Sequence, residues 1–205
     1  MTVLFCLVGW MDYYQGLANG DRIRGGGSYV DDNNTGSEIH NFSIETIVEE
    51  PYFPSDKDDG YVDVCQGFVM CQSQIRIENL GASKQDDWID GITVVWLARD
   101  PDHGKVYIVG WYKNARVYRH WKEPDLDTDR GYDDCYYNIQ ARAVDCTLLP
   151  YRQRRFHIPK ASSTTSGGIG RSNVWFASDK KNEDIVRGVL NYIERYEADN
   201  KSVAM

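Results

Sequence analysis

The sequence predicts a β-rich α+β fold, built from a strongly curved sheet or a small barrel with one C-terminal amphipathic helix. Three observations predict this class. Short apolar runs alternate with segments rich in Gly, Pro, Asp and Asn, which is typical of strands and turns. The segment Asp100–Gly104 is a strong turn signal between two β-rich runs. Only residues 183–197 repeat apolar side chains at a clear helical spacing.

The length of 205 residues predicts a single domain that spans residues 1–205. Hydrophobic residues make up 41% of the chain, which is enough to fill a core. Two acid-rich stretches, residues 45–63 and 123–134, are interpreted as loop insertions in this domain. The five cysteines form no dense framework, and the apolar start of the chain lacks the basic region of a signal peptide. We therefore expect a cytoplasmic protein that makes no contact with a membrane.

The first expected strand is Thr2–Trp10, a near-continuous apolar run that is typical of a central strand. Ile92–Ala98 and Lys105–Tyr112 flank the turn signal and are expected to form a hairpin, and Arg116–His120 is expected to continue the sheet. Five more segments have the alternation or β-rich composition of strands: Ile39–Ile44, Tyr61–Phe68, Gln74–Asn79, Tyr136–Ala143 and Cys146–Leu149.

The expected helix is Glu183–Glu197. Ile185, Val189 and Ile193 lie four residues apart and define one apolar stripe. Asn182 stands at the position of an N-cap, and the acidic first turn suits the positive end of a helix dipole. The stripe predicts that this helix packs on the sheet.

Charge is segregated along the chain. Residues Gly104–Lys122 hold five Lys/Arg, five aromatic residues and no acid, and Cys146–Ser178 holds five more Lys/Arg without an acid, although the net charge is -8. Basic groups neutralise phosphates, and flat aromatic faces stack on bases. The two windows favour nucleic-acid binding if they meet on one face. The alternative is that the two windows lie on different sides of the molecule, where their basic side chains are simply exposed to solvent.

Neither a metal nor another cofactor is expected. The chain has no Cys-x-x-Cys pair, and its four histidines are scattered. The acidic run Asp125–Asp134 lacks the glycine and glutamate spacing of a calcium loop. The Gly-rich segment Gly167–Gly170 is followed by no Lys-Ser/Thr pair, so it does not match a P-loop.

Aromatic and polar side chains gather where the first strand is expected to end. Trp10 and Tyr14 offer faces for stacking, and Gln15 offers an amide for a base edge. The alternative for Trp10 is that it packs in the core. A second group of donors and acceptors follows the Gly-rich segment Gly25–Gly27, and it consists of Ser28, Glu38 and Asn41.

Two further features remain open at this point. Glu38 lies two residues before His40, and this pair also permits an acid–base interpretation if the side chains converge on a reacting atom. Trp111 and Tyr112 are neighbours on an expected strand, so they face opposite sides of the sheet. We expect one of them to be inside and the other to face a groove, with Asn114 beside it at the strand's end.

Residues over most of the chain match the pattern of a known family: Gly9-Trp10 with Tyr14-Gln15-Gly16, Gly25-Gly26-Gly27 with Tyr29, Glu38 with Asn41-Phe42, Val94–Trp96, Val109–Ala115 with Val117-Tyr118, Leu148–Pro150, and Ser172–Trp175. In this order they resemble the N-terminal module that precedes HNH-type nuclease domains in some bacterial modification-dependent restriction proteins. That module is similar in logic to the PUA-like group of EVE, YTH and ASCH domains.

The resemblance implies a PUA-like fold and a reader that flips a modified base from DNA into an aromatic pocket, as part of restriction or defence. Residues 1–205 contain no HNH or other nuclease signature. This departs from the family pattern and leaves two alternatives: either the chain works with a nuclease in trans, or it has another role. The acidic stretches at 45–63 and 123–134 depart from what a DNA-facing surface needs.

We therefore expect a nucleic-acid-binding module that favours modified duplex DNA. The residues expected to form the base pocket are Trp10, Tyr14, Gln15, Ser28, Asn41, Trp111 and Asn114. The residues expected to contact phosphates are Lys113, Arg116, Arg119, Arg154 and Arg155. Two alternatives stay open: a small-molecule or nucleotide sensor that uses the same pocket, and a nucleic-acid-processing enzyme that uses Glu38 and His40.

Overall fold

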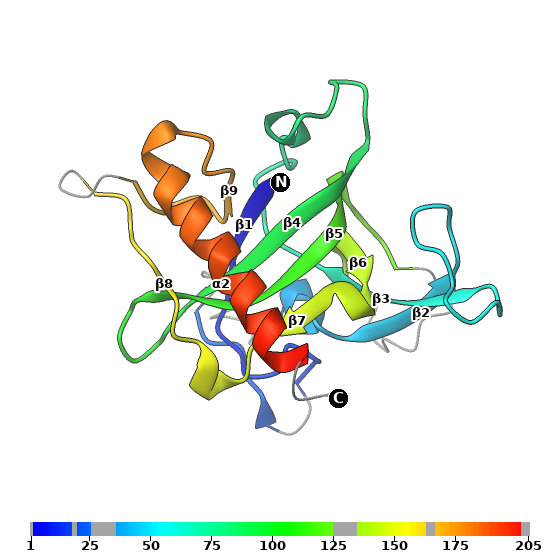
Figure 1. The fold of residues 1–205 in the computed structure, drawn as a ribbon, viewed down its shortest axis with the longest axis horizontal. Helices are drawn as coiled ribbons and strands as arrows, with labels where there is room; N and C mark the ends of the chain where they lie inside the picture. Colours follow the sequence, from blue (N-terminus) through cyan, green and yellow to red (C-terminus); the bar gives the residue numbers. More distant parts are fainter. Residues whose placement is uncertain (1, 18–19, 26–35, 125–134, 163–166, 202–205) are drawn as a thin grey trace.

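The fold is a mixed α+β structure dominated by one sheet (Figure 1). It is known from a computed structural model, which describes residues 2–17, 20–25, 36–124, 135–162 and 167–201. Within these ranges, nine strands join in a single sheet, and the one α-helix, α2, spans Glu183–Lys201. The expected β-rich class and the expected C-terminal helix are both confirmed.

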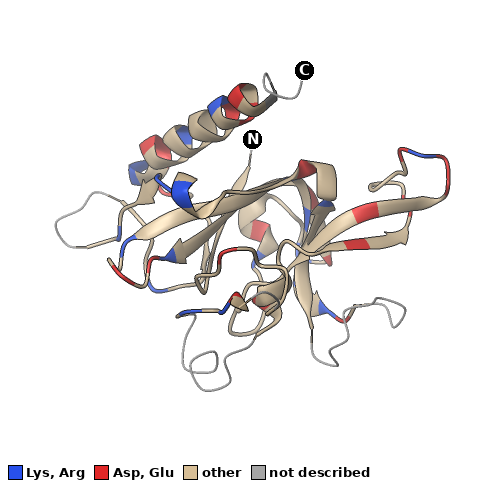
Figure 2. Cartoon of the chain, turned by 90° about the horizontal axis from the view of Figure 1, so that it is seen from below, with Lys and Arg blue, Asp and Glu red and all other residues tan. Residues whose placement is uncertain are grey.

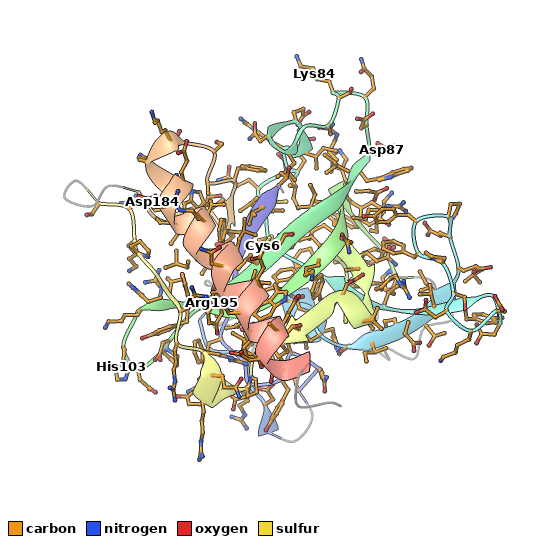
Figure 3. All side chains as sticks on the ribbon, viewed as in Figure 1. Cys6, Lys84, Asp87, His103, Asp184 and Arg195 are labelled. Atoms are coloured by element: carbon orange, nitrogen blue, oxygen red, sulfur yellow. The ribbon has the colours of Figure 1, made fainter. Side chains whose placement is uncertain are left out.

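Two long strands form the centre of the sheet. β4 (Trp88–Arg99) and β5 (Val106–Lys122) are antiparallel and follow each other through the tight turn at Asp100–Gly104, as expected. The Asp100 carboxylate accepts hydrogen bonds from the N–H groups of Asp102 and His103 and so stabilises this turn. The hairpin spans the molecule, because the turn marked by His103 and the segment marked by Lys84 and Asp87 lie at opposite ends (Figure 3).

The remaining strands extend the sheet on both sides. β1 (Val3–Val8) is parallel to β4 and is followed by the short edge strand β9 (Val174–Trp175). The other edge of β5 pairs in succession with three strands: β8 (His157–Ile158), β7 (Cys146–Leu148) and β6 (Tyr137–Arg142). β6 pairs with β3 (Tyr61–Gly67), and β3 pairs with the edge strand β2 (Ile44–Val48).

The described strands form an open sheet, in the order β2-β3-β6-β5-β4-β1-β9. The alternative of a closed small barrel is therefore not confirmed. The residues at 45–63 belong mostly to the β2–β3 hairpin, which projects from the body and carries acidic residues along its length (Figure 2). The second expected acidic insertion, 123–134, lies almost wholly outside the described residues.

Register shifts bend the central hairpin. The pairing of β4 with β5 slips between Ile89 and Ile92, between Ile92 and Val94, and between Trp96 and Leu97. Gly91 and Asn114 lie at the first two shifts with φ angles of 79° and 48°, which is the left-handed region that bulges use. Each bulge reverses which face the following side chains occupy.

The central strands of the sheet are buried on both faces. Helix α2 crosses one face (Figure 1) and packs Val189 and Ile193 against Phe5, Leu97 and other strand side chains, which form the helix-side core. The opposite face is covered by loop segments and by two short 3-10 helices, η2 (Ser37–His40) and η3 (Ile77–Leu80), which form the loop-side core. The covering of both faces explains why β1 and β4 are almost continuously apolar.

Two expected strands are wrong. Ile39–Ile44 begins with the last two residues of η2 and runs through a turn to the first residue of β2. Gln74–Asn79 leads into η3, which is capped by Gly81 with a φ of 108°. In Gln74–Asn79 the alternate residues Ile75 and Ile77 are buried, as in a strand, but a short turn buries them equally well. In Ile39–Ile44 the four residues from Ile39 to Phe42 are all buried and Ile44 is exposed, which does not match a strand pattern. Asn182, expected as an N-cap, accepts a hydrogen bond from the N–H of Gly168 through Oδ1.

Candidate functional site

Five aromatic side chains form a connected cluster on the loop-side core: Trp10, Tyr14, Phe42, Trp96 and Tyr112. We call this set the aromatic cluster. Ring centres lie 6.0 Å apart between Tyr14 and Phe42, 5.3 Å between Phe42 and Tyr112, and 5.3 Å between Tyr112 and Trp96. Three loop residues at the end of β1 and in the segment after η2 thus meet two residues of the central hairpin. All five are at most 5% exposed.

Arg154 connects Trp10 to the rest of the cluster. Its guanidinium carbon lies 5.1 Å from the centre of the Trp10 ring and 5.8 Å from that of Tyr14. The guanidinium also donates hydrogen bonds to the carbonyl oxygens of Leu149, Met11 and Asp12. Burial lowers the pKa of this group from its ordinary value. Arg154 therefore stabilises the Trp10 loop, and its donors are occupied by backbone rather than available to a phosphate.

Glu38 lies beside the cluster as a buried carboxyl. Its Oε1 accepts a hydrogen bond of 2.7 Å from the backbone N–H of Gly9, and the Tyr14 hydroxyl donates to the Gly9 carbonyl at 2.7 Å. Burial raises the pKa of Glu38 to about 7, against the opposing effect of the Gly9 N–H. The carboxyl can therefore act as a donor or as an acceptor near neutral pH.

The loop that carries Tyr14 has a constrained backbone. Tyr14 has a φ of 53°, a conformation that is uncommon for a bulky residue. The Asp21 carboxylate accepts hydrogen bonds from the N–H groups of Asp12, Tyr13 and Tyr14 and holds this conformation. Strained backbone held by its surroundings is a frequent property of functional sites.

The two amide residues expected in the base pocket bond to the protein backbone. Asn41 is fully buried, and its amide forms a reciprocal pair with Phe68, accepting from its N–H at 2.8 Å and donating to its carbonyl at 3.1 Å. Gln15 is exposed, and its Nε2 donates to the Phe42 carbonyl at 3.3 Å. Both side chains lie next to the aromatic cluster. The amide nitrogen and the amide oxygen of Asn41 each have a backbone partner on Phe68.

Two buried donors of the aromatic cluster have no acceptor among the described residues. They are the indole N–H groups of Trp10 and Trp96, whose side chains are 2% and 0% exposed. A buried N–H without an acceptor is costly, and such groups are rare in folded proteins. Trp96 belongs to the expected strand Ile92–Ala98, but a strand pattern does not indicate whether an indole N–H has an acceptor.

The remaining members of the expected base pocket lie elsewhere. Trp111 is on the helix-side core, where its indole N–H donates to Glu197 at 3.1 Å and its ring packs edge-on against Tyr196. Asn114 is exposed at the bulge of β5, and its backbone carbonyl accepts a hydrogen bond from the Tyr52 hydroxyl. The sheet therefore separates Trp111 from Trp10 and Tyr14. Ser28 lies outside the described residues.

Most of the expected phosphate contacts are engaged in ion pairs. Lys113 bonds to Glu197, and Arg119 bonds to Glu78. Arg116 bonds to Asp90 and Glu50 at 2.7 Å each, and its guanidinium lies within 5.2 Å of the ring centres of Tyr52, Phe53 and Trp88. Arg155 is exposed and donates to the Arg152 carbonyl, so its charge remains open to solvent.

The structure also forms a polar cleft, of which one wall belongs to the acid-free window Cys146–Ser178 and the other lies outside both windows. It lies between residues 70–76 and 171–176 and contains Arg76 and Arg171. The signal was present in the sequence, because Val64–Ile77 contains no Asp or Glu. The segment holds only one basic residue, so charge counting did not select it.

Glu38 and His40 have separate partners. His40 Nδ1 lies 3.1 Å from the Ser43 hydroxyl, whereas Glu38 bonds to Gly9. The described part of the chain contains no group of three or more His, Cys, Asp or Glu placed to hold a metal ion. It also contains no helix that combines the length and the apolar character needed to cross a membrane. Comparisons with protein-family models, with curated proteins and with solved structures find no match to this chain.

Proposed function

We propose that this chain is a non-catalytic nucleic-acid-binding module that recognises a modified base in DNA, flipped out of the duplex and held at the aromatic cluster. The proposal follows the resemblance to PUA-like reader modules, and it keeps restriction or defence as the biological role. In this arrangement Trp10 and Tyr14 supply ring faces, and the indole N–H groups and Glu38 supply edge contacts.

The observation that carries the proposal is the pair of buried indole N–H groups at Trp10 and Trp96, for which the described part of the chain offers no acceptor. A modified base presents carbonyl and ring-nitrogen acceptors that such donors can satisfy. The Glu38 carboxyl, with its pKa raised to about 7, adds a group that can bond to either a donor or an acceptor. The strained backbone at Tyr14 lies in the same place.

Recognition at this cluster requires a change in the loops that bear it. Trp10, Tyr14 and Phe42 are buried in the described conformation, so a base reaches their ring faces only when these loops open. Flipping a base out of the stack costs a few kcal/mol, and stacking with edge hydrogen bonds must offset this cost. We expect binding to be coupled to movement of the segment that contains Trp10 and Tyr14.

A fluorescence-polarisation panel tests the proposal. Matched duplexes with unmodified, methylated and hydroxymethylated bases are titrated at two salt concentrations. We expect one modification to bind at least tenfold more tightly than the unmodified duplex, and all affinities to fall steeply as salt rises. Equal affinity for every duplex, or no binding to any, contradicts the proposal.

A small-molecule or nucleotide sensor is the second candidate, because the two indole donors, which find no acceptor among the described residues, fit a free nucleoside as well as a flipped base. A mononucleotide that raises the melting temperature strongly, without any affinity for duplex, favours the sensor. An enzyme that uses Glu38 and His40 is less consistent with their separate partners. Metal-dependent nicking that is lost in Glu38→Gln would support it. A nuclease that acts in trans remains part of the proposal as a partner.

A further inference from the structure

The cleft between residues 70–76 and 171–176 has the chemistry of an anion site. Its volume is about 750 Å³, and it is open to solvent. Among the described residues, its lining contains Arg76 and Arg171 together with side-chain amides and hydroxyls, for example those of Gln72, Ser172 and Asn173, and no Asp or Glu. In a chain of net charge -8, an acid-free concave surface with two arginines is unusual.

The guanidinium groups of Arg76 and Arg171 differ from those of Arg116, Arg119 and Arg154. Both are exposed, and neither guanidinium has a hydrogen-bond or ion-pair partner within the described part of the chain. By contrast, Arg116 and Arg119 each bond to acidic side chains, and Arg154 is occupied by backbone carbonyl groups. A guanidinium without a partner retains its planar set of donors for a phosphate.

The cleft adjoins the core that contains the aromatic cluster. Cys71, Val174 and Phe176 line the cleft and also pack against the loop-side core. The reciprocal hydrogen bonds between Asn41 and Phe68 fix the start of the segment that forms one wall. The aromatic cluster and the cleft therefore share contacts with the same core. Lys113, which was expected to contact phosphates, instead pairs with Glu197 of helix α2 on the opposite face of the sheet.

We propose that Arg76 and Arg171 bind phosphates of the nucleic-acid backbone in this cleft, next to the site that holds the base. This proposal rests on the proposed function and assigns its backbone contacts. The amides and hydroxyls of the cleft bond to phosphate and sugar oxygens, which fixes the position of the strand without reading its sequence. The arginine contacts supply affinity, and the aromatic cluster supplies the preference for a modified base.

The test compares two double variants of equal charge. Arg76→Gln with Arg171→Gln removes the cleft cations, and Arg187→Gln with Arg195→Gln removes two exposed arginines of α2, where Figure 3 marks Arg195. Affinity for the best modified duplex is measured against salt. We expect the cleft variant to lower the slope of log K against log salt by about 2, since each phosphate contact contributes about 0.9. Its preference for modified over unmodified duplex should not change.

The helix variant should keep the slope of the wild-type protein. Equal slopes for the wild-type protein and the cleft variant, or equal losses in both variants, overturn the cleft assignment while leaving the reader function in place. Loss of the modified-base preference in the cleft variant also overturns it, because the arginines would then read the base. No duplex binding by the wild-type protein overturns the proposed function and this inference together. Urea unfolding of both variants verifies that they are folded.

Discussion

The guanidinium of Arg154 lies over the ring of Trp10, with its central carbon 5.1 Å from the ring centre. This contact joins the segment after β7 to the segment after β1, and three carbonyl oxygens complete the arginine's hydrogen bonds. A cation on an aromatic face contributes more when it is desolvated, as it is here. The position of Trp10, and with it the shape of the aromatic cluster, therefore depends on residue 154.

We predict that Arg154→Gln destabilises the fold by about 3 kcal/mol, because it leaves buried carbonyl groups without donors and removes a packed side chain. The adjacent Arg155→Gln, at an exposed residue, should change stability by less than about 0.5 kcal/mol. Urea unfolding of both variants measures the difference. Similar midpoints for the two variants would show that Arg154 does not have this structural role.

Asn41 should act as a structural residue as well as a neighbour of the site. Asn41→Ala removes both hydrogen bonds to Phe68 and leaves a buried N–H and a buried carbonyl unpaired, so we expect a loss of about 2–4 kcal/mol. Asn79→Ala, at an exposed asparagine, is the matched control and should be nearly neutral. Thermal unfolding distinguishes the two variants. An Asn41→Ala variant as stable as the wild-type protein would contradict the structural role of Asn41 and leave only its expected role as a base-reading group.

Glu38 should make stability depend on pH. Its pKa is raised from 4.5 to about 7 on folding, so the folded state binds more protons than the unfolded state between these values. Stability should therefore fall as pH rises from about 4.5 to about 7, by up to about 3 kcal/mol, and then level off. Glu38→Gln should abolish this decline. Urea midpoints at several pH values check it, and parallel curves for both proteins would contradict the assignment.

Gly67 allows Trp96 and Tyr112 to approach β3. A Cβ at this position would lie 2.5 Å from a ring carbon of Trp96 and 3.2 Å from one of Tyr112. We expect Gly67→Ala to cost about 1–3 kcal/mol and to alter the tryptophan fluorescence of the cluster. A Cβ at Gly170 meets no atom within 4 Å, so Gly170→Ala is the control. Equal stability of the two variants would show that the cluster has room to rearrange.

The parts of the fold that sequence predicts well are those with a local cause. The turn residues at Asp100–Gly104 predict the central hairpin, and the stripe of Ile185, Val189 and Ile193 predicts the helix. The error at Gln74–Asn79 has a simple origin. Alternating burial arises from a strand, but it also arises from a 3-10 turn that places two apolar side chains in the core, and only long-range packing decides between them.

Site residues were harder to predict because side-chain partners come from distant segments. Alternation places Trp111 and Tyr112 on opposite faces, and the structure confirms this, but both are fully buried because loops and α2 cover the two faces. The arginines at 116 and 119 stand in a basic window, yet their acidic partners come from residues 50, 78 and 90. Local charge counting does not detect pairing of this kind.

The most direct measurement of the central claim is the modified-base preference of Trp96→Phe. The substitution keeps a ring and removes the buried N–H that has no acceptor among the described residues. Trp121→Phe, at a half-exposed indole that packs on Tyr136, is the matched control. One edge hydrogen bond contributes about 0.5–1.5 kcal/mol, so the ratio of modified to unmodified affinity should fall roughly three- to tenfold in Trp96→Phe and stay unchanged in Trp121→Phe. A folded Trp96→Phe protein with the wild-type ratio would contradict recognition at the aromatic cluster.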